Sequence, residues 1–385
     1  MPEAAKNLKT IQHAEFEWLP TGDEALEEML RAIRGARVSI RLEMYIFHPG
    51  ATAESFRQAL VEAARSGVKV QVLLDALGSV DLPESFWDEL KASGGEFRWF
   101  NPLSLHRIGV RDHRKILICD EKMAFIGGYN IADEYAGDGV SRGWRDLGLK
   151  LRGPLVSALS QAFDDMFQIA DFQHKRFARL RKSTRQKTVW APNAHLLLSA
   201  PGRQRSPLKH ALVTDFSKAK KIQIMAAYFL PTWRLRRLLM RVARRGGKVQ
   251  IILPAKSDVP LMQLASRSLY RRLLRAGVEI YEYEPQILHA KLIVVDDKIA
   301  YAGSANLDIR SLHLNYELLA RIEDRKLAQQ AAELFKADLV RSRRIYYEQW
   351  VRERHFWSRL KSRLAYWIFV RLDPYLVSRQ LRRLR

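Results

Sequence analysis

Two segments of the sequence carry the same set of side chains suited to phosphate chemistry. Each reads H-x-K-x₄-D-x₆-G-G/S-x-N, beginning at His113 in the first copy and at His289 in the second. Residues i and i+2 of a strand project from one face, so each histidine would lie beside the lysine that follows it, Lys115 or Lys291. Such a pair suits an anionic substrate, because the lysine can bind phosphate oxygens while the imidazole attacks phosphorus.

The remaining motif positions predict supporting roles. The glycines near 127 and 303 permit a tight turn and a close approach of the backbone. Asn130, Ser304 and Asn306 are expected to bind phosphate oxygens as neutral donors or to orient the site. Asp120 and Asp296 complete the two catalytic motifs. Because each of them ends a strand, we expect it to bond turn amides and not to act as acid or base.

The motifs occupy matching places in a long internal repeat of helix, glycine turn and strand. A lone H-x-K in a strand is common and usually reflects surface or core polarity. Its recurrence with four further fixed positions in a repeat indicates function. The alternation of helix and strand predicts an α/β fold with a mainly parallel sheet covered by helices. The repeated pairs are 25–47 with 208–229, 56–75 with 235–254, and 86–102 with 269–285.

The repeat predicts an N-terminal domain over residues 1–171 and a C-terminal domain over 191–340, each with one motif. Residues 172–190 hold seven Lys or Arg and no acidic residue, which indicates a solvated linker or, equally well, a surface helix end. Residues 341–385 hold 13 basic, three acidic and nine aromatic residues. This tail is expected to lie as an amphipathic helix in the headgroup layer of a membrane, or to pack on the enzyme, and the two are compatible.

The composition narrows the class of partner. The chain of 385 residues carries 65 Lys and Arg against 42 Asp and Glu, a formal net charge of +23. Such an excess predicts a phosphate-bearing partner, either nucleic acid or an anionic membrane surface. A single cysteine excludes a disulfide framework and a cysteine zinc site. No apolar stretch is long enough to span a bilayer and no signal sequence is visible, so the cytoplasm is the expected compartment.

The paired motifs resemble the HKD motifs of the phospholipase D superfamily, and the chain is similar to bacterial cardiolipin synthases of the short kind that lack transmembrane helices. The resemblance extends from about residue 12 to residue 340. One departure is Gly128, where the superfamily often has serine, although similar synthases also show Gly-Gly. Outside the motifs, the resemblance rests on residues 42–47, 74–79, 111, 144–147, 228–231, 306–311 and 315–317.

The resemblance implies two phospholipase D-like α/β/α domains related by a pseudo-twofold axis, with the active site at their interface. It implies a two-step transfer, in which one histidine attacks the phosphodiester to give a phosphohistidine and the other protonates the leaving alcohol. Either histidine could attack, with His113 favoured by analogy. Glu317 is expected to orient His289, and Asp146 to orient His113. No metal or other cofactor is implied, and no ligand cluster accompanies the motifs.

The implied function is that of a cardiolipin synthase, which joins two phosphatidylglycerols and releases glycerol. Phosphatidylethanolamine or glycerol remain open as acceptors. The enzyme would lie peripherally on the cytoplasmic face of the bacterial inner membrane, bound to its anionic surface.

Two other classes are alternatives. One is another phospholipase D-type phosphatidyltransferase or hydrolase, or an HKD nuclease, whose polyphosphate substrate the charge of +23 would suit. Small superfamily nucleases usually carry one motif and lack the flanking segments, so no nucleic-acid partner is expected. The other is a non-catalytic basic binding module, which the intact histidine and lysine of both motifs disfavour.

Overall fold

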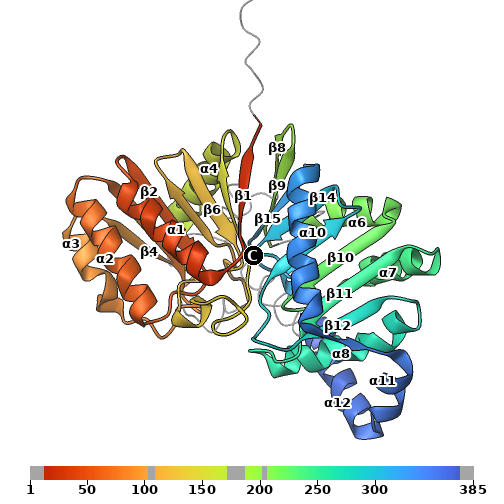
Figure 1. Cartoon of the computed structure of the whole chain (residues 1–385). Helices are drawn as coiled ribbons and strands as arrows, with labels where there is room; N and C mark the ends of the chain where they lie inside the picture. Colours follow the sequence, from red (N-terminus) through yellow and green to blue (C-terminus); the bar gives the residue numbers. More distant parts are fainter. Residues whose placement is uncertain (1–12, 103–108, 171–186, 202–205, 373–385) are drawn as a thin grey trace, which may run out of the picture.

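The computed structural model describes residues 13–102, 109–170, 187–201 and 206–372. In these residues the chain forms two α/β halves that lie side by side, each built on one mixed sheet with helices packed against it (Figure 1). The first half is coloured red to yellow and the second green to blue. No helix within the described ranges is long and apolar enough to cross a membrane.

The sheet of the first half has seven strands among the described residues, in the order β1-β7-β6-β5-β2-β3-β4. β2, β3 and β4 are parallel, and the other neighbours pair antiparallel. The strands are β1 (Glu15–Leu19), β2 (Ser39–Met44), β3 (Lys69–Asp75), β4 (Glu96–Phe100), β5 (Ile116–Cys119), β6 (Met123–Gly127) and β7 (Gly148–Arg152). The α-helices are α1 (Gly22–Gly35), α2 (Ala51–Arg65), α3 (Asp88–Ala92) and α4 (Leu155–Ile169).

The sheet of the second half has the order β16-β12-β11-β10-β13-β14-β15-β9-β8 within the described residues, and its β10, β11 and β12 are parallel. The strands are β8 (Lys187–Ala191), β9 (Ala194–Ser199), β10 (Lys221–Ala226), β11 (Lys248–Pro254), β12 (Glu279–Tyr283), β13 (Lys291–Val295), β14 (Ile299–Gly303), β15 (Glu317–Ile322) and β16 (Ser342–Ile345). The α-helices are α6 (Pro207–Lys218), α7 (Trp233–Arg244), α8 (Pro260–Leu274), α9 (Ile309–His313), α10 (Arg325–Val340), α11 (Tyr347–Glu353) and α12 (Phe356–Trp367).

Parallel pairing is confined to three strands of each sheet, so the expectation of a mainly parallel sheet is wrong. The strand after each motif histidine, β5 or β13, runs antiparallel to both of its neighbours. The pairing with the following strand, β6 or β14, is caused by a tight turn at Asp120–Glu121 and Asp296–Asp297, whose residues have φ of 53° or 54°. Two consecutive residues at positive φ are typical of the turn that closes a two-residue hairpin. The motif therefore encodes a hairpin and not a crossover.

Local sequence accounts for where several helices begin. Thr21, Ser206, Asp308 and Asp324 each precede a helix and accept a hydrogen bond from a backbone N–H of its first turn. Two strands are apolar enough to be covered on both faces: β2, which pairs with β5, and β15, which pairs with β14, are buried over their full length. Buried strands and capped helices fix the loops at the strand ends, where the motif residues lie.

The two halves share one hydrophobic core. Leu149 of β7 and Phe163 of α4 belong to the same cluster as Leu196 of β9 and Leu318 of β15. Because these side chains come from both sheets, the halves are packed directly against one another. We call the contact surface between the two halves the seam, and Figure 1 shows β1, β9, β15 and α10 along it.

The predicted domain boundaries stay expectations, but residues near them have a defined place. Residues 172–186 of the predicted linker lie outside the described residues, whereas Lys187–Ala191 form β8 at one edge of the second sheet. Ser342–Ile345, at the start of the predicted tail, form β16 at the opposite edge. α11 and α12 follow at the outer end of the second half, with α12 packed on α8 (Figure 1). Residues 373–385 of the tail lie outside the described part of the chain.

Candidate active site

Each motif histidine is held by backbone hydrogen bonds to the other half of the molecule. The backbone N–H of His113 donates to the carbonyl oxygen of Tyr316 at 3.0 Å, and the N–H of Tyr316 donates to the carbonyl of Arg111 at 2.9 Å. In the same way, the N–H of His289 donates to the carbonyl of Arg145 at 2.7 Å. These short parallel bridges bring the two motifs together at the seam.

The imidazole of His113 is oriented by a buried carboxylate of the second half. Its Nδ1 lies 3.0 Å from Oε2 of Glu317, the first residue of β15. The hydroxyl of Ser304 donates to the same carboxylate oxygen at 2.5 Å. Glu317 has no exposed surface, and among the described residues Nε2 of His113 makes no hydrogen bond. A carboxylate on Nδ1 fixes the tautomer that leaves Nε2 free to react.

The imidazole of His289 is oriented by a carboxylate of the first half. Its Nδ1 lies 2.5 Å from Oδ2 of Asp146, which directly precedes Leu147 and β7. The other oxygen of this carboxylate accepts from the backbone N–H of Leu147 at 2.7 Å. The contact holds the Asp146 side chain in place, so both histidines have a fixed carboxylate partner.

The pairing expected from the resemblance is therefore wrong. Glu317 does not orient His289 and Asp146 does not orient His113; each carboxylate crosses the seam to the histidine of the other half. The physical reason is that each of these carboxylates directly follows a residue that pairs with the opposite histidine segment, Tyr316 or Arg145. Both predicted residues belong to the site, with their partners exchanged.

The two motif lysines lie beside the histidines and supply the positive charge of the site. Nζ of Lys115 donates to the carbonyl of His113 at 2.8 Å and lies 4.9 Å from the ring centroid of Tyr45. Nζ of Lys291 lies 2.8 Å from Nδ1 and 3.1 Å from Nε2 of His289. The four motif side chains are buried, which strengthens their electrostatic interactions with a bound phosphate.

Burial lowers the pKa of both histidines. The pKa of His113 falls to about 4, because desolvation and the nearby charges of Lys115 and Lys291 outweigh the opposing effect of Glu317. The pKa of His289 is also lowered, first by burial and then by Lys291, against the opposing charge of Asp146. In the free protein both imidazoles are thus neutral at pH 7, the form that a nucleophilic histidine needs.

The neighbouring groups are shifted by the same causes. Burial lowers the pKa of Lys115 to about 7 and also lowers the pKa of Lys291. Burial alone would raise the pKa of Glu317, but His113 and Lys115 hold it below its usual value. Glu317 is consequently a carboxylate at neutral pH, able to stabilise an imidazolium at His113.

Asp120 and Asp296 lie at the far ends of the motif strands and not beside the histidines. The carboxylate of Asp120 accepts hydrogen bonds from the backbone N–H groups of residues 37, 38 and 39, at the start of β2. Asp296 accepts from the N–H groups of residues 220 and 221, at the start of β10. The structure places both residues where they hold the hairpin turn to the neighbouring strand, which is the expected structural role, and outside the catalytic cluster.

The three predicted phosphate donors have protein partners in this structure. The side chain of Asn130 accepts from the backbone N–H of Ile46 at 3.1 Å and donates to the hydroxyl of Tyr135 at 2.6 Å. Ser304 is bonded to Glu317 as described above, and Oδ1 of Asn306 lies 3.4 Å from the backbone nitrogen of Tyr228. Their contacts indicate orienting roles: Ser304 bonds the carboxylate that contacts His113, and the asparagines hold the loops after β2 and β10.

The glycine pair in the first motif has a steric cause. A Cβ atom on Gly128 would lie 2.0 Å from Oδ1 of Asp146, the carboxylate that orients His289. In the second motif the corresponding residue is Ser304, whose hydroxyl bonds Glu317. The preceding Gly127 and Gly303 allow close approach of the next strand, since a Cβ there would lie 2.7 Å from the Cα of Gly148 or 2.3 Å from the carbonyl oxygen of Leu318. Gly128 therefore belongs to the first motif because Asp146 occupies the space of its side chain.

Aromatic rings enclose the histidines, a feature that the sequence motifs do not specify. The ring centroid of Tyr45 lies 4.8 Å from that of His113. Tyr135, Trp144 and Tyr228 lie 5.4, 5.7 and 6.5 Å from His289. The hydroxyl of Tyr228 bonds the carboxylate of Asp258, in the loop between β11 and α8. The available signal was position: Tyr45 directly follows β2 and Tyr228 lies two residues after β10. Both strands end at the edge of their sheet where the histidines lie, which we call the catalytic edge.

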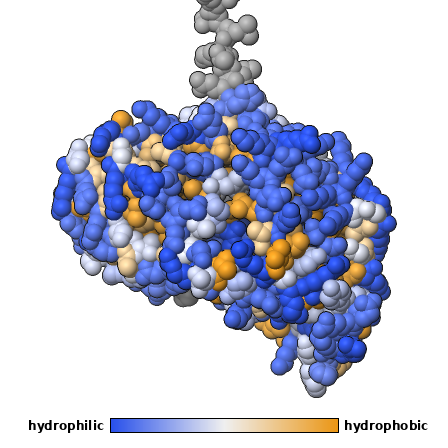
Figure 2. Space-filling view, in the orientation of Figure 1, coloured by the Kyte–Doolittle hydropathy of each residue, from blue (hydrophilic) through white to orange (hydrophobic). Residues whose placement is uncertain are grey.

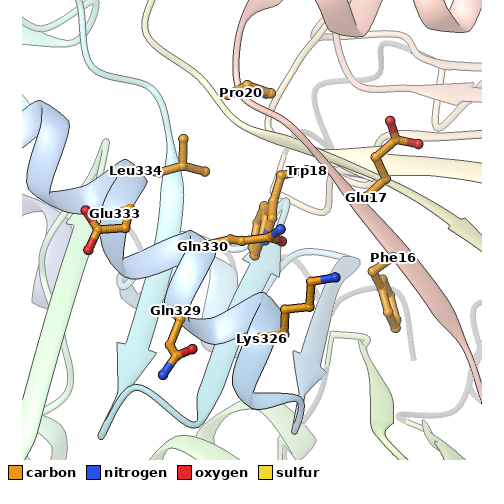
Figure 3. A pocket seen from close by; sticks show the side chains of 9 residues that line it. All are labelled: Phe16, Glu17, Trp18, Pro20, Lys326, Gln329, Gln330, Glu333 and Leu334. Atoms are coloured by element: carbon orange, nitrogen blue, oxygen red, sulfur yellow. The ribbon is translucent and has the colours of Figure 1, made fainter.

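A groove of about 750 Å³ lies elsewhere on the seam, between β1 and α10 (Figure 3). None of the residues gathered around the histidines lines it. Nε1 of Trp18 donates to the carbonyl of Leu327 at 3.2 Å, so one of the lining residues makes a direct contact between the halves. Figure 2 shows the surrounding face as largely hydrophilic. The lining residues are Phe16, Glu17, Trp18, Pro20, Lys326, Gln329, Gln330, Glu333 and Leu334.

Several known proteins are similar to this chain in sequence or in fold. Residues 29–167 and 212–339, one segment in each half, match the family described as "Cardiolipin synthase, PLD-like domain". The major cardiolipin synthase of Bacillus subtilis is 34% identical over 354 residues, which covers 89% of this chain and 72% of that protein. Cardiolipin synthase B of Salmonella typhi is 31% identical over 370 residues, covering 94% of this chain and 89% of that protein.

Among solved structures, phosphatidylserine synthase of Haemophilus influenzae superposes with a TM-score of 0.74 at 14% identity, over 94% of both chains. At that identity the likeness concerns the fold alone. The family match spans most of the chain, and the fold and the paired motifs agree with it. This chain belongs to the phospholipase D-like cardiolipin synthase family.

Proposed function

We propose that this chain is a cardiolipin synthase that transfers a phosphatidyl group from one phosphatidylglycerol to another. The carrying observation is the exchange of carboxylates across the seam, which gives two oriented imidazoles, His113 and His289, each with a lysine beside it. Two imidazoles with separate orienting groups suit a reaction that needs a nucleophile and an acid-base catalyst in one site. The family match supports phosphatidylglycerol as the substrate.

In the first step, Nε2 of His113 attacks the phosphorus of one phosphatidylglycerol. A nitrogen–phosphorus bond forms, the bond from phosphorus to the terminal glycerol oxygen breaks, and His289 gives its proton to that oxygen, releasing glycerol. The free Nε2 of His113 supports this assignment, whereas Nε2 of His289 lies 3.1 Å from Lys291. The negative charge of the bound phosphodiester favours the protonated form of His289, so His289 takes up a proton from solvent when the substrate binds.

In the second step, the terminal hydroxyl of a second phosphatidylglycerol attacks the phosphohistidine. His289, now neutral, takes the proton of that hydroxyl, the nitrogen–phosphorus bond breaks, and cardiolipin leaves. Lys115 and Lys291 neutralise the equatorial phosphate oxygens in both steps. Water in place of the second lipid would give phosphatidic acid, so the site must admit an alcohol in preference to water.

We place the enzyme on the cytoplasmic face of the cell membrane, bound to anionic phospholipid. The net charge of +23 supports an anionic partner. Basic residues near such a surface are each worth about 1 kcal/mol of binding free energy.

The test is product analysis of the full chain incubated with detergent-dispersed phosphatidylglycerol in the presence of a chelator. We expect cardiolipin and glycerol in equal amounts, measured by mass spectrometry. Phosphatidic acid alone would identify a hydrolase, and nicking of plasmid DNA without lipid products would identify a nuclease. Either result would overturn the proposal.

The histidine variants test the mechanism. His113→Ala and His289→Ala should each lower turnover by at least about 10³-fold, because nucleophile and acid act as a unit. His48→Ala, at an exposed histidine outside the site, is the matched control and should keep wild-type turnover. Acid-quenched wild-type enzyme should carry a phosphatidyl group on His113, and its recovery on His289 would reverse the assigned roles.

A further inference from the structure

α12 carries apolar side chains on two opposite faces. Ser362 and Ala365 are buried against the second half, and Ala365 belongs to the same core cluster as Leu269 and Tyr270 of α8. On the other side, large apolar residues recur at a spacing of three or four and face solvent. This exposed set, called the α12 stripe, has exposed fractions of 70% for Phe356, 69% for Trp357, 45% for Leu360, 57% for Leu364 and 52% for Trp367.

The two faces have different roles. A helix that only packed on the enzyme would turn polar residues outward, with one apolar face. Contiguous apolar patches on soluble proteins mark surfaces that bind a partner or a membrane. The α12 stripe is thus a surface that remains to be covered, since within the described residues α12 already has its protein contact on α8.

The charges around the stripe indicate which partner covers it. Arg359, Lys361, Arg363 and Arg371 flank it, are exposed, and make no ion pair among the described residues. The sequence has no acidic residue from Arg354 to Leu372. A second copy of the chain would bring the same positive charge to this surface, whereas an anionic bilayer offers both opposite charge and an apolar interior. Exposed tryptophans flanked by basic residues are typical of helices that lie in the headgroup layer.

The helix that carries the stripe also contacts α7, the helix that follows the loop bordering His289. The guanidinium of Arg236, in the first turn of α7, lies 5.6 Å from the ring centroid of Tyr366 in the last turn of α12. α7 begins at Trp233, five residues after Tyr228, whose ring borders His289. Trp233 is 64% exposed, and Leu261 in the first turn of α8 is 41% exposed. Exposed apolar residues are thus present both on α12 and in the first turns of α7 and α8.

We propose that the α12 stripe and Trp233 dock the enzyme on an anionic phospholipid bilayer, with the catalytic edge of the second half turned toward the lipid. The inference rests on the proposed function only for the identity of the lipid that enters the site. Docking in this orientation brings the phosphodiester of a membrane lipid to the histidines without lifting the whole lipid into water. The charges of the lipid headgroups pair with the basic residues that flank the stripe, and the indole rings lie at the acyl boundary.

The test uses the full chain with Trp357→Ser and Trp367→Ser combined. Binding is measured by flotation with vesicles of equal parts phosphatidylglycerol and phosphatidylcholine. The readout is the fraction of bound protein and does not depend on turnover. We expect the vesicle partition coefficient to fall about tenfold or more, since each tryptophan contributes a large apolar area to the interface. The matched control combines Trp190→Ser and Val340→Ser, which are 70% and 84% exposed on β8 and α10, and it should bind as the wild type does.

Three further measurements keep the outcome unambiguous. Thermal melts show whether the variant is folded, and Arg359→Ser with Arg363→Ser provides a second variant that leaves every apolar contact in place and should also weaken binding. Turnover on detergent-dispersed phosphatidylglycerol should stay within about twofold of wild type in all variants, because the surface residues are outside the chemistry. An inactive wild type that still binds vesicles through the stripe would refute the proposed function and leave the docking surface standing.

Unchanged vesicle binding by the folded tryptophan variant would overturn the inference. Equal losses in the control would show that the contact is not specific to α12, which also overturns it. A change in sedimentation without a change in vesicle binding would show that a second copy covers the stripe.

Discussion

The two halves of the active site have the same motif but different supporting groups. On the first side, His113 is oriented by a glutamate that is held by the hydroxyl of Ser304. On the second side, His289 is oriented by a shorter carboxylate, Asp146, that is held by its neighbouring backbone N–H and approaches Gly128. The duplicated chain kept the two imidazoles and changed what holds them, which suits two histidines with different tasks.

The difference extends to the residue before each carboxylate. Arg145 precedes Asp146, and its guanidinium pairs with the buried Asp338 of α10 at 2.8 Å. The corresponding residue on the other side is Tyr316, whose ring packs 5.7 Å from that of Phe100. One side is thus supported by a buried ion pair and the other by an aromatic contact. A histidine that donates a proton changes its charge during the reaction. An ion pair behind it responds to that change more strongly than an aromatic contact does.

Removing the carboxylates should produce the largest effects. Glu317→Gln and Asp146→Asn keep the shape but no longer fix the tautomer, and each should lower kcat by about 10³-fold, as measured by cardiolipin formation. Glu333→Gln on the exposed side of α10 is the control. Imidazole NMR signals separate the two sides: Glu317→Gln should shift those of His113 and spare His289. A shift at His289 instead would contradict the crossed pairing.

Substitution at the glycine pair tests the second side alone. Gly128→Ala places a methyl group where the carboxylate of Asp146 lies, at 2.0 Å from Oδ1, and must displace it. We expect kcat to fall about 100-fold. This is more than the effect of losing one hydrogen bond and less than the effect of losing the orienting carboxylate. Ser304→Gly, the reciprocal change on the first side, removes one hydrogen bond to Glu317 and should lower kcat about tenfold. Wild-type turnover of Gly128→Ala would show that Asp146 has room to move.

The sequence predicted the chemistry of these residues better than their partners. The repeat, the two motifs and both carboxylates were recognisable because residue type and spacing carry them. The crossed pairing was not, since Glu317 lies 204 residues from His113 and the pairing depends on how two halves pack. The antiparallel hairpins were missed because Asp120 and Asp296 were interpreted as strand ends, while their positive φ makes them turn residues.

The roles of the amide and hydroxyl groups were also beyond the sequence. Asn130 looked like a phosphate donor by its place in the motif, but its side chain bonds Ile46 and Tyr135 in the folded protein. A motif records that a residue is required without recording which atom it touches. Tyr45, Trp144 and Tyr228 stood in the flanking segments that carry the resemblance, but their contacts with the histidines were not predicted, because buried aromatic residues in strands and loops are usually core residues.

The pH dependence of kcat/KM should report His113 and Lys115 on the first side of the site, and its alkaline limb also reports the proton that His289 takes up when the substrate binds. The pKa of His113 is about 4, so its neutral, nucleophilic form is present above pH 4 and is lost as the pH falls through that value. The pKa of Lys115 is about 7, so its positive charge is present below pH 7 and is lost as the pH rises. We expect a maximum between these values, with about a tenfold loss per pH unit on either side. Detergent-dispersed substrate avoids the surface pH of vesicles, and a flat profile from pH 5 to 9 would contradict the assignment of Lys115.

Disrupting the ion pair behind Asp146 should have the smallest effect on turnover and a clear effect on stability. Asp338→Asn leaves the buried guanidinium of Arg145 without its ionic partner, which typically destabilises a protein by about 3 kcal/mol or more. The melting temperature should therefore fall by several degrees, measured by calorimetry. Because the carbonyl of Arg145 still accepts from the backbone of His289, the chemical step should slow only a few-fold. The control is Lys336→Gln, which removes an exposed ion pair with Glu333 on the same helix and should change neither quantity. If Asp338→Asn slowed turnover as much as Asp146→Asn does, the ion pair would be part of the catalytic machinery of the second side and not only its support.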